Sequence, residues 1–129
     1  MNPLAATNQS DYSQKVVWLG RGELLAAMNS EAIYKLQKGE RVRFRPRGHS
    51  MSGRINDGDL VTCAPITPGQ VCVGDAVVAR VQGKRRELVV LHEVLEIRDE
   101  QFLIGARNRR VDGWIAGTAI LGKAVQIES

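Results

Sequence analysis

Hydrophobic and polar residues follow two different periods along this chain, and the change falls near residue 40. Between residues 22 and 39 an apolar residue recurs every four positions, at Leu24, Met28, Ala32 and Leu36. That spacing places the four side chains on one stripe of a helix. Gly39 follows the stripe and suits a helix C-terminus. The pattern therefore predicts a helical segment over residues 23–36.

From residue 40 onward the pattern is that of strands. Arginines at positions 41, 43, 45 and 47 alternate with Val42, Phe44 and Pro46, which predicts a strand with basic and apolar faces. Short apolar runs between turn formers predict five more strands, at residues 60–64, 76–81, 87–97, 101–105 and 119–127. No crossover helix is evident after residue 55, and parallel strands need one. The expected fold is mainly β and antiparallel or mixed.

These patterns divide the chain into three parts. Residues 1–14 are polar and pattern-free, so a flexible tail is expected. Residues 15–39 form the N-terminal helical segment, and residues 40–129 form one β domain. The apolar stripe of the helix should pack against the β domain or against a second copy of the chain, which leaves a homodimer open.

Composition narrows the class of protein. The 129 residues fit one domain, and 18 Lys and Arg against 14 Asp and Glu give a net charge of +4, below the usual footprint of a nucleic-acid-binding protein. Nucleic acid ranks lowest as a partner, because basic strips at residues 41–47 and 107–110 have no aromatic platform. No 18-residue apolar run and no signal-peptide pattern occur, and Cys63 and Cys72 are expected to be reduced thiols. A cytoplasmic protein without a membrane partner is expected.

Candidate chemistry is concentrated in the run from Gly48 to Asp59, GHSMSGRINDGD. Gly48 permits an unusual backbone angle at the entry to a site. Ser50 precedes a short segment, 51–55, that can form one helical turn whose first amides could stabilise an oxyanion. A serine hydroxyl becomes a nucleophile only when a base removes its proton. On this stretch alone, Ser50 as nucleophile and Ser50 as a cap of the turn are equally good readings.

The order of motifs separates these readings. Gly48-His49-Ser50-Met51, then Gly74-Asp75, then a β-hairpin and a final Gly122-Lys123 resemble the superfamily that joins LexA-type repressor peptidases to type I signal peptidases. The resemblance covers residues 41–127. It implies a compact LexA/signal-peptidase-like β fold and a serine nucleophile, here Ser50.

The chain departs from the LexA-type pattern at the general base. That pattern has a lysine on the strand after the Gly-Asp hairpin, whereas residues 87–97 contain no lysine and carry His92 instead. The exchange is similar to the archaeal and endoplasmic-reticulum signal peptidases, which use histidine. A neutral imidazole is a suitable base near neutral pH. The alternative for His92 is a hydrogen-bonded core residue.

A third residue extends the resemblance. Asp112 falls on the orienting aspartate of the histidine-type signal peptidases, although Ala106 stands where that pattern has a first aspartate. An orienting carboxylate improves a Ser–His pair. The competing interpretation is a simple turn at Asp112 and Gly113, which that dipeptide forms well.

The sequence thus predicts a soluble serine peptidase that hydrolyses a peptide or protein, with Ser50, His92 and Asp112 in the catalytic site. The amides of Ser50 and Met51 are the oxyanion candidates, and Gly48 is a further oxyanion or substrate-binding candidate. No metal or organic cofactor is indicated, because two His and two separated Cys make a poor ligand set. The alternative is an inactive regulator or interaction module that keeps the fold. Small versions of this domain without a membrane anchor resemble the products of phage and mobile-element genes, so such an origin is expected. Residues 10–20 contain no Ala-Gly or Cys-Gly bond, which argues against self-cleavage.

Overall fold

The computed structural model describes residues 9–18, 30–107 and 110–129, with the side chains of 9–18 and of residue 47 left aside. It is mostly β, with one short α-helix, as the sequence predicts. The α-helix and the strands, in chain order, are β1 (Gln9–Trp18), α2 (Ser30–Gln37), β2 (Arg41–Arg47), β3 (Leu60–Ala64), β4 (Ala76–Gln82), β5 (Glu87–Arg98), β6 (Gln101–Gly105), β7 (Val111–Ala116) and β8 (Ile120–Glu128).

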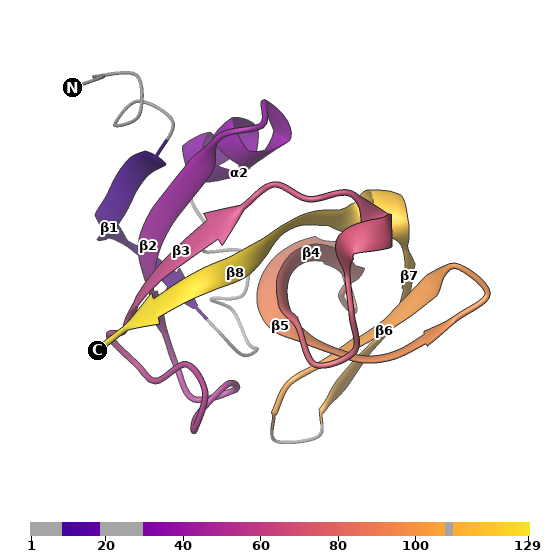
Figure 1. Ribbon diagram of the computed structural model, residues 1–129. Helices are drawn as coiled ribbons and strands as arrows, with labels where there is room; N and C mark the ends of the chain where they lie inside the picture. The colour runs from indigo at the N-terminus through magenta and orange to yellow at the C-terminus, as the bar shows by residue number, and fades with distance from the viewer. Residues whose placement is uncertain (1–8, 19–29, 108–109) are drawn as a thin grey trace.

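The strands form one coiled sheet in the order β1-β2-β3-β8-β4-β5-β6-β7. Neighbouring strands within β2 to β8 are antiparallel, and β1 runs parallel to β2. The long strand β8 pairs with both β3 and β4, so it joins the β2–β3 side to the strongly curled β4–β7 side (Figure 1). The pairing shifts register in both of these ladders, as expected where a sheet bends.

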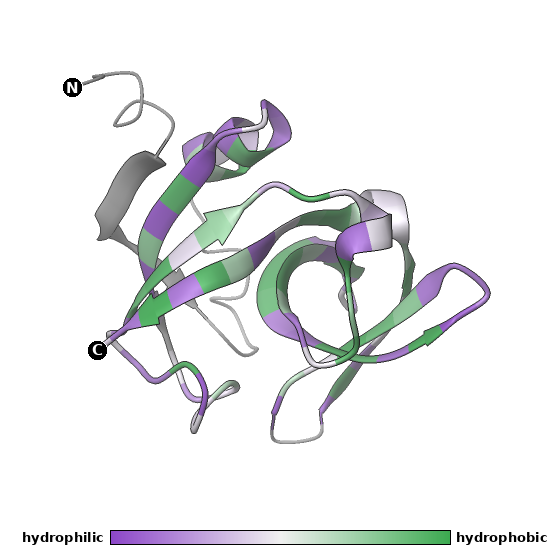
Figure 2. Cartoon of the chain, viewed as in Figure 1, coloured by the Kyte–Doolittle hydropathy of each residue, from purple (hydrophilic) through white to green (hydrophobic). Residues whose placement is uncertain are grey.

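Two hydrophobic cores lie on opposite sides of the β4–β5 hairpin. Ala76, Val78 and Leu91 point into the core beneath α2, whereas Val77 and Val90 point into the core of the curled side. Because both faces are covered, the middle of β5 is apolar without alternation. Strand β2 keeps its period of two, and Figure 2 shows its hydrophilic and hydrophobic positions in alternate bands.

The N-terminal part differs from the sequence-based expectation. The predicted tail, 1–14, overlaps strand β1, and the predicted helix over 23–36 is described only from Ser30, where α2 begins. Residues 1–8 and 19–29, including Leu24 and Met28, lie outside the described residues. A strand such as β1 needs no apolar pattern, because its backbone hydrogen bonds to β2 define it. Within the described part of the chain, no helix has both the length and the apolar character needed to cross a bilayer.

The two cysteines differ in exposure, so their reactivity tests directly whether β3 is packed in the core. Cys63 lies in β3 with none of its surface accessible, and burial raises the pKa of its thiol, whereas Cys72 is exposed. The thiolate is the reactive form. Iodoacetamide at neutral pH should therefore modify Cys72 alone in the folded protein and both thiols in urea, as counted by mass spectrometry. Modification of Cys63 without denaturant would contradict the packing of β3.

Candidate active site

The loop that carries Ser50 is fixed before and after the serine. Gly48 follows β2 with a backbone φ of 107°, a conformation that residues other than glycine rarely adopt. Its amide donates a hydrogen bond of 2.8 Å to Oδ1 of Asp57. The predicted backbone angle at the entry to the site is present. The same bond means that the Gly48 amide is already used and is not a free donor toward a substrate.

After Ser50 the chain makes the one helical turn that the sequence predicts. The Ile55 amide donates to the Met51 carbonyl at 2.8 Å, which is the spacing of an α-helical bond. The Met51 and Ile55 side chains are completely buried in the core beneath α2. They anchor the turn, so that Ser50 is held at its start with 6% of its surface exposed.

His92 lies in the middle of β5, opposite Val77 of β4. It is 1% exposed, and β5 lies between β4 and β6 in the sheet. Its Nε2 lies 3.1 Å from Oγ of Ser50, although 42 positions separate the two residues in the chain. The strand and the loop therefore bring the two predicted residues within hydrogen-bonding distance.

Asp112 reaches His92 because of an irregularity in β7. Ile104 pairs with Gly113 and Gly105 pairs with Val111, so Asp112 is an extra residue between two paired positions. Such a bulge redirects a side chain, and Gly113 with a φ of 132° accommodates it. Oδ2 of Asp112 lies 2.6 Å from Nδ1 of His92. The Asp112-Gly113 dipeptide, for which a simple turn was the competing interpretation, lies within strand β7.

These contacts form a chain from serine hydroxyl to imidazole to carboxylate. With its proton on Nδ1, the imidazole donates to Asp112 and presents the lone pair of Nε2 to the Ser50 hydroxyl. This tautomer is the one that accepts a proton from serine. Ser50 and His92 are buried, which excludes most water from their contact and strengthens it, whereas Asp112 is half-buried. The arrangement can remove a proton from Ser50 when its oxygen attacks an electrophile.

Backbone amides beside Ser50 are placed to stabilise negative charge. In the part of the chain that the structure describes, the amides of Ser50 and Met51 donate no hydrogen bond, whereas Ser52 and Gly53 donate to His49 and Asn56. Two unused donors at the start of a turn suit an oxyanion on the atom that Ser50 attacks. The Ser50 carbonyl accepts a bond of 2.7 Å from the Arg107 amide, which ties the serine loop to the β6–β7 connection.

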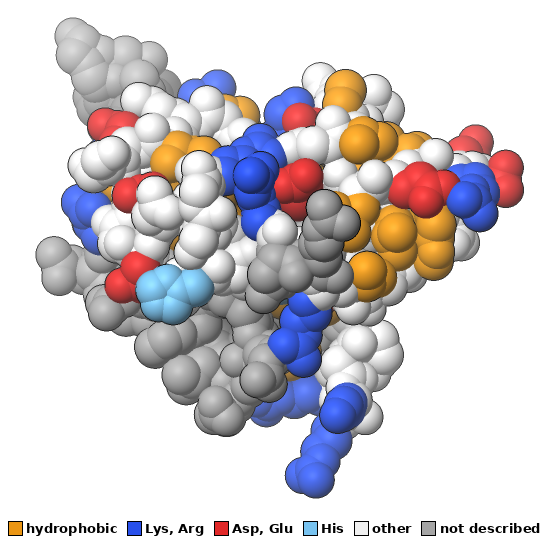
Figure 3. Space-filling model, turned by 90° about the horizontal axis from the view of Figure 1, so that it is seen from below, with side chains coloured by type: hydrophobic (Ala, Val, Ile, Leu, Met, Phe, Trp, Pro, Cys, Tyr) orange, Lys and Arg blue, Asp and Glu red, His pale blue; other side chains and the backbone are white. Residues whose placement is uncertain are grey.

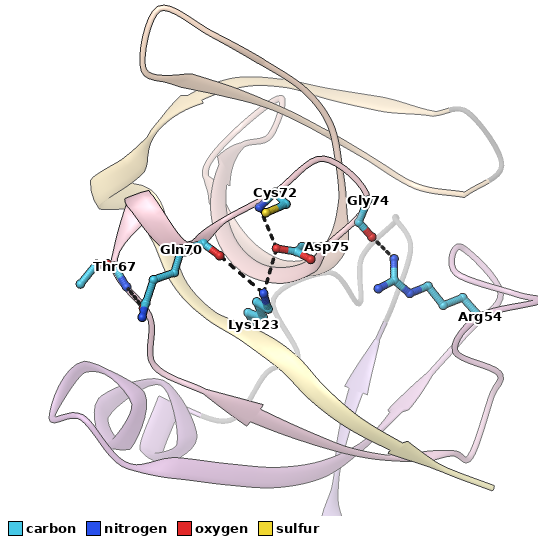
Figure 4. Close-up of polar contacts among 7 residues, drawn as sticks. All are labelled: Arg54, Thr67, Gln70, Cys72, Gly74, Asp75 and Lys123. Atoms are coloured by element: carbon cyan, nitrogen blue, oxygen red, sulfur yellow. Dashed lines mark hydrogen bonds and ion pairs between the residues drawn. The ribbon is translucent and has the colours of Figure 1, made fainter.

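A polar cluster around Glu93 was not predicted from the sequence. Its Oε1 lies 3.8 Å from Nη1 of Arg54 and 3.6 Å from Nη1 of Arg107. Arg54 also donates to the Gly74 carbonyl (Figure 4). The cluster joins the serine loop, the β6–β7 connection and the residue next to His92. Its only signal in the sequence is a carboxylate within the apolar run of β5.

The turn before β4 is braced from β8. Nζ of Lys123 lies 3.1 Å from Oδ2 of Asp75, the same oxygen that accepts a bond of 2.8 Å from the Cys72 amide, as Figure 4 shows. The Gly74 amide donates to the Val94 carbonyl and the Val94 amide donates to the Asp75 carbonyl. The Gly-Asp motif thus fixes β5 two residues beyond His92. Among the described residues, no group of three or more His, Cys, Asp or Glu side chains could hold a metal ion.

Comparison with known proteins yields one match. The family model described as Peptidase S24-like matches residues 23–125, most of the chain, including Ser50, His92 and Asp112. This match confirms the resemblance at the level of the family. No curated protein and no solved structure is similar enough to count as a match.

Proposed function

This chain belongs to the Peptidase S24-like family, and we propose that it is a serine peptidase in which Ser50, His92 and Asp112 act as a triad. The observation that carries the proposal is the pair of contacts on His92, 3.1 Å to Ser50 and 2.6 Å to Asp112. Three elements far apart in the sequence bring these groups together. A histidine that only fills the core also needs hydrogen-bond partners, but it has no need for a serine hydroxyl at Nε2 together with a carboxylate at Nδ1.

The first half of the reaction forms an acyl-enzyme. Oγ of Ser50 attacks the carbonyl carbon of the substrate while Nε2 of His92 takes its proton. The carbonyl oxygen becomes an oxyanion, which the amides of Ser50 and Met51 stabilise. Asp112 stabilises the imidazolium through Nδ1–H. The imidazolium then protonates the leaving amine, the C–N bond breaks, and the acyl group remains on Ser50 as an ester.

The second half releases the acyl group. A water molecule enters in place of the amine, and His92 removes its proton as the water oxygen attacks the ester carbonyl. The C–O bond to Ser50 breaks, and His92 returns the proton to Oγ. No metal or organic cofactor takes part in this scheme, and the substrate is a peptide or protein.

The second candidate function is an inactive regulator or interaction module with the same fold. The low exposure of Ser50 and His92 favours it, because a substrate must reach groups that are almost covered. Fold alone does not decide between the two functions.

A serine-directed fluorophosphonate separates the two functions. It forms a covalent bond only with an activated serine, so we expect one adduct, located at Ser50 by tandem mass spectrometry. The same sample should cleave members of a random peptide library. Absence of the adduct and of cleavage in protein that is folded by circular dichroism would leave the interaction module as the function.

Replacing Asp112 with Asn should lower kcat without removing either reacting group. The amide is uncharged and its NH2 group can donate to Nδ1, so the imidazole can adopt the wrong tautomer and the imidazolium loses its counter-charge. We expect a fall of roughly 10³- to 10⁴-fold. The matched control is Asp59→Asn, in the serine loop but away from His92, which should leave kcat unchanged. Equal kcat values for Asp112→Asn and wild type would show that Asp112 has no part in the reaction.

A further inference from the structure

The tip of the β4–β5 hairpin carries three adjacent cations. Lys84, Arg85 and Arg86 are exposed, and in the described part of the chain none of them forms an ion pair. The nearest acidic residue in the sequence, Glu87, lies 3.4 Å from Arg80 on the neighbouring strand. Like charges at this spacing repel one another, so the tip favours an anionic partner.

These cations line a pocket that reaches the proposed triad. The pocket measures about 430 Å³ and is lined by Lys84, Arg85, Arg86 and Arg110, by the apolar side chains of Val81, Leu88 and Val111, and by Asp112. Asp112 is the one acidic residue among the described residues of the lining, and that carboxylate already lies against Nδ1 of His92. Figure 3 shows basic side chains extending to the lower edge of one face, apart from the acidic groups. The pocket is therefore positive with an apolar floor.

We propose that this pocket binds an acidic segment of the peptide substrate, and this inference rests on the proposed peptidase function. Only the imidazole of His92 separates Asp112 from Ser50. An extended peptide advances roughly 3.3 Å per residue, so a few residues connect a scissile bond at Ser50 with the pocket. A Glu or Asp side chain there pairs with the tip cations, and its methylene groups contact the apolar floor.

A peptide fits these observations better than a nucleic acid does. Single-stranded nucleic acids are bound by aromatic side chains that stack on bases, and the described residues that line this pocket include no aromatic one. The pocket volume matches a few side chains and not an extended groove. Val81 and Leu88 offer contact to an aliphatic chain rather than to a phosphate backbone.

The test separates recognition from cleavage. The protein is the Ser50→Ala variant of the full chain, and the probes are two fluorescein-labelled peptides that differ only in an internal Glu-Asp-Glu or Gln-Asn-Gln. Fluorescence anisotropy should give at least tenfold tighter binding of the acidic peptide, with the difference decreasing as salt rises. Adding Lys84→Gln, Arg85→Gln and Arg86→Gln should abolish the difference. The charge-matched control, with Lys38→Gln, Arg41→Gln and Arg98→Gln, should retain it.

Three outcomes would overturn the inference. They are equal affinity for the two peptides, an undiminished difference after the three hairpin substitutions, and tighter binding of a labelled single-stranded DNA through the same cations. Fluorophosphonate labelling of the wild-type chain reports on the triad separately, because this probe carries no acidic segment. Acidic-peptide binding by a protein that never reacts with the probe would refute the peptidase and leave the pocket in place.

Discussion

Replacing Ser50 or His92 with Ala is expected to reduce peptide cleavage by roughly 10⁶-fold, to below detection, while the protein remains folded. Ser50→Ala removes the atom that forms the acyl-enzyme. Among the described residues, His92 is the only group within hydrogen-bonding distance of that atom that can accept its proton, and His92→Ala removes it. The two variants should be equally inactive, because a triad acts as a unit. Cleavage of the best library peptide, followed by mass spectrometry, is the measurement.

The neighbouring residues provide matched controls for this experiment. Ser52 and His49 lie in the same loop and are exposed. Ser52→Ala and His49→Ala should therefore retain wild-type cleavage and fluorophosphonate labelling. If wild type and Ser50→Ala are equally inactive on every peptide yet bind the same partner equally well, the chain is an interaction module that has kept the shape of a peptidase.

Leu36→Asp is expected to produce the largest loss of stability. Leu36 is 1% exposed, and its side chain lies between α2 and the close approach of β8 at Gly122. A carboxylate there has no basic partner among the core residues, and burying an unpaired charge costs several kcal/mol. We expect a loss of more than about 4 kcal/mol, a large part of the stability of a small domain.

Urea denaturation followed by circular dichroism measures this loss. The matched control is Tyr34→Asp, on the same helix and 57% exposed, which should change the free energy of unfolding by less than about 0.5 kcal/mol. Equal tolerance of the two substitutions would mean that α2 does not pack on the sheet.

The strands at 41–47, 60–64 and 101–105 agree with the structure to the residue, because clear alternation or an apolar run ends at a turn former on each side. Strand β7 was missed for the opposite reason. Its residues are exposed or half-buried, and Asp112 and Gly113 in its middle are typical of a turn. Strand β1 is also invisible to pattern analysis, since its pairing depends on backbone hydrogen bonds.

Some parts of the candidate site could be predicted from the sequence and others could not, for a related reason. The pairing of Ser50 with His92 came from the order of short motifs and not from periodicity. The direction of the Asp112 side chain depends on which residue of β6 pairs with Gly113. This register is set by both strands together, so the sequence of one strand does not determine it. The Glu93 cluster needs three separate segments to meet, so only the folded chain shows it.

The position of β7 at the end of the sheet has a consequence for how activity responds to heating. In the part of the chain that the structure describes, Asp112 belongs to a strand that pairs with β6 alone, whereas His92 belongs to β5, which lies between β4 and β6. Marginal strands open at a smaller free-energy cost than the core does. Opening of β7 would remove the carboxylate from His92 while Ser50 stayed beside it. Under the proposed function, heating would then lower peptide cleavage in two stages. The first is the loss of an oriented base at a temperature where the spectroscopic signal is still native, and the second is unfolding of the whole domain.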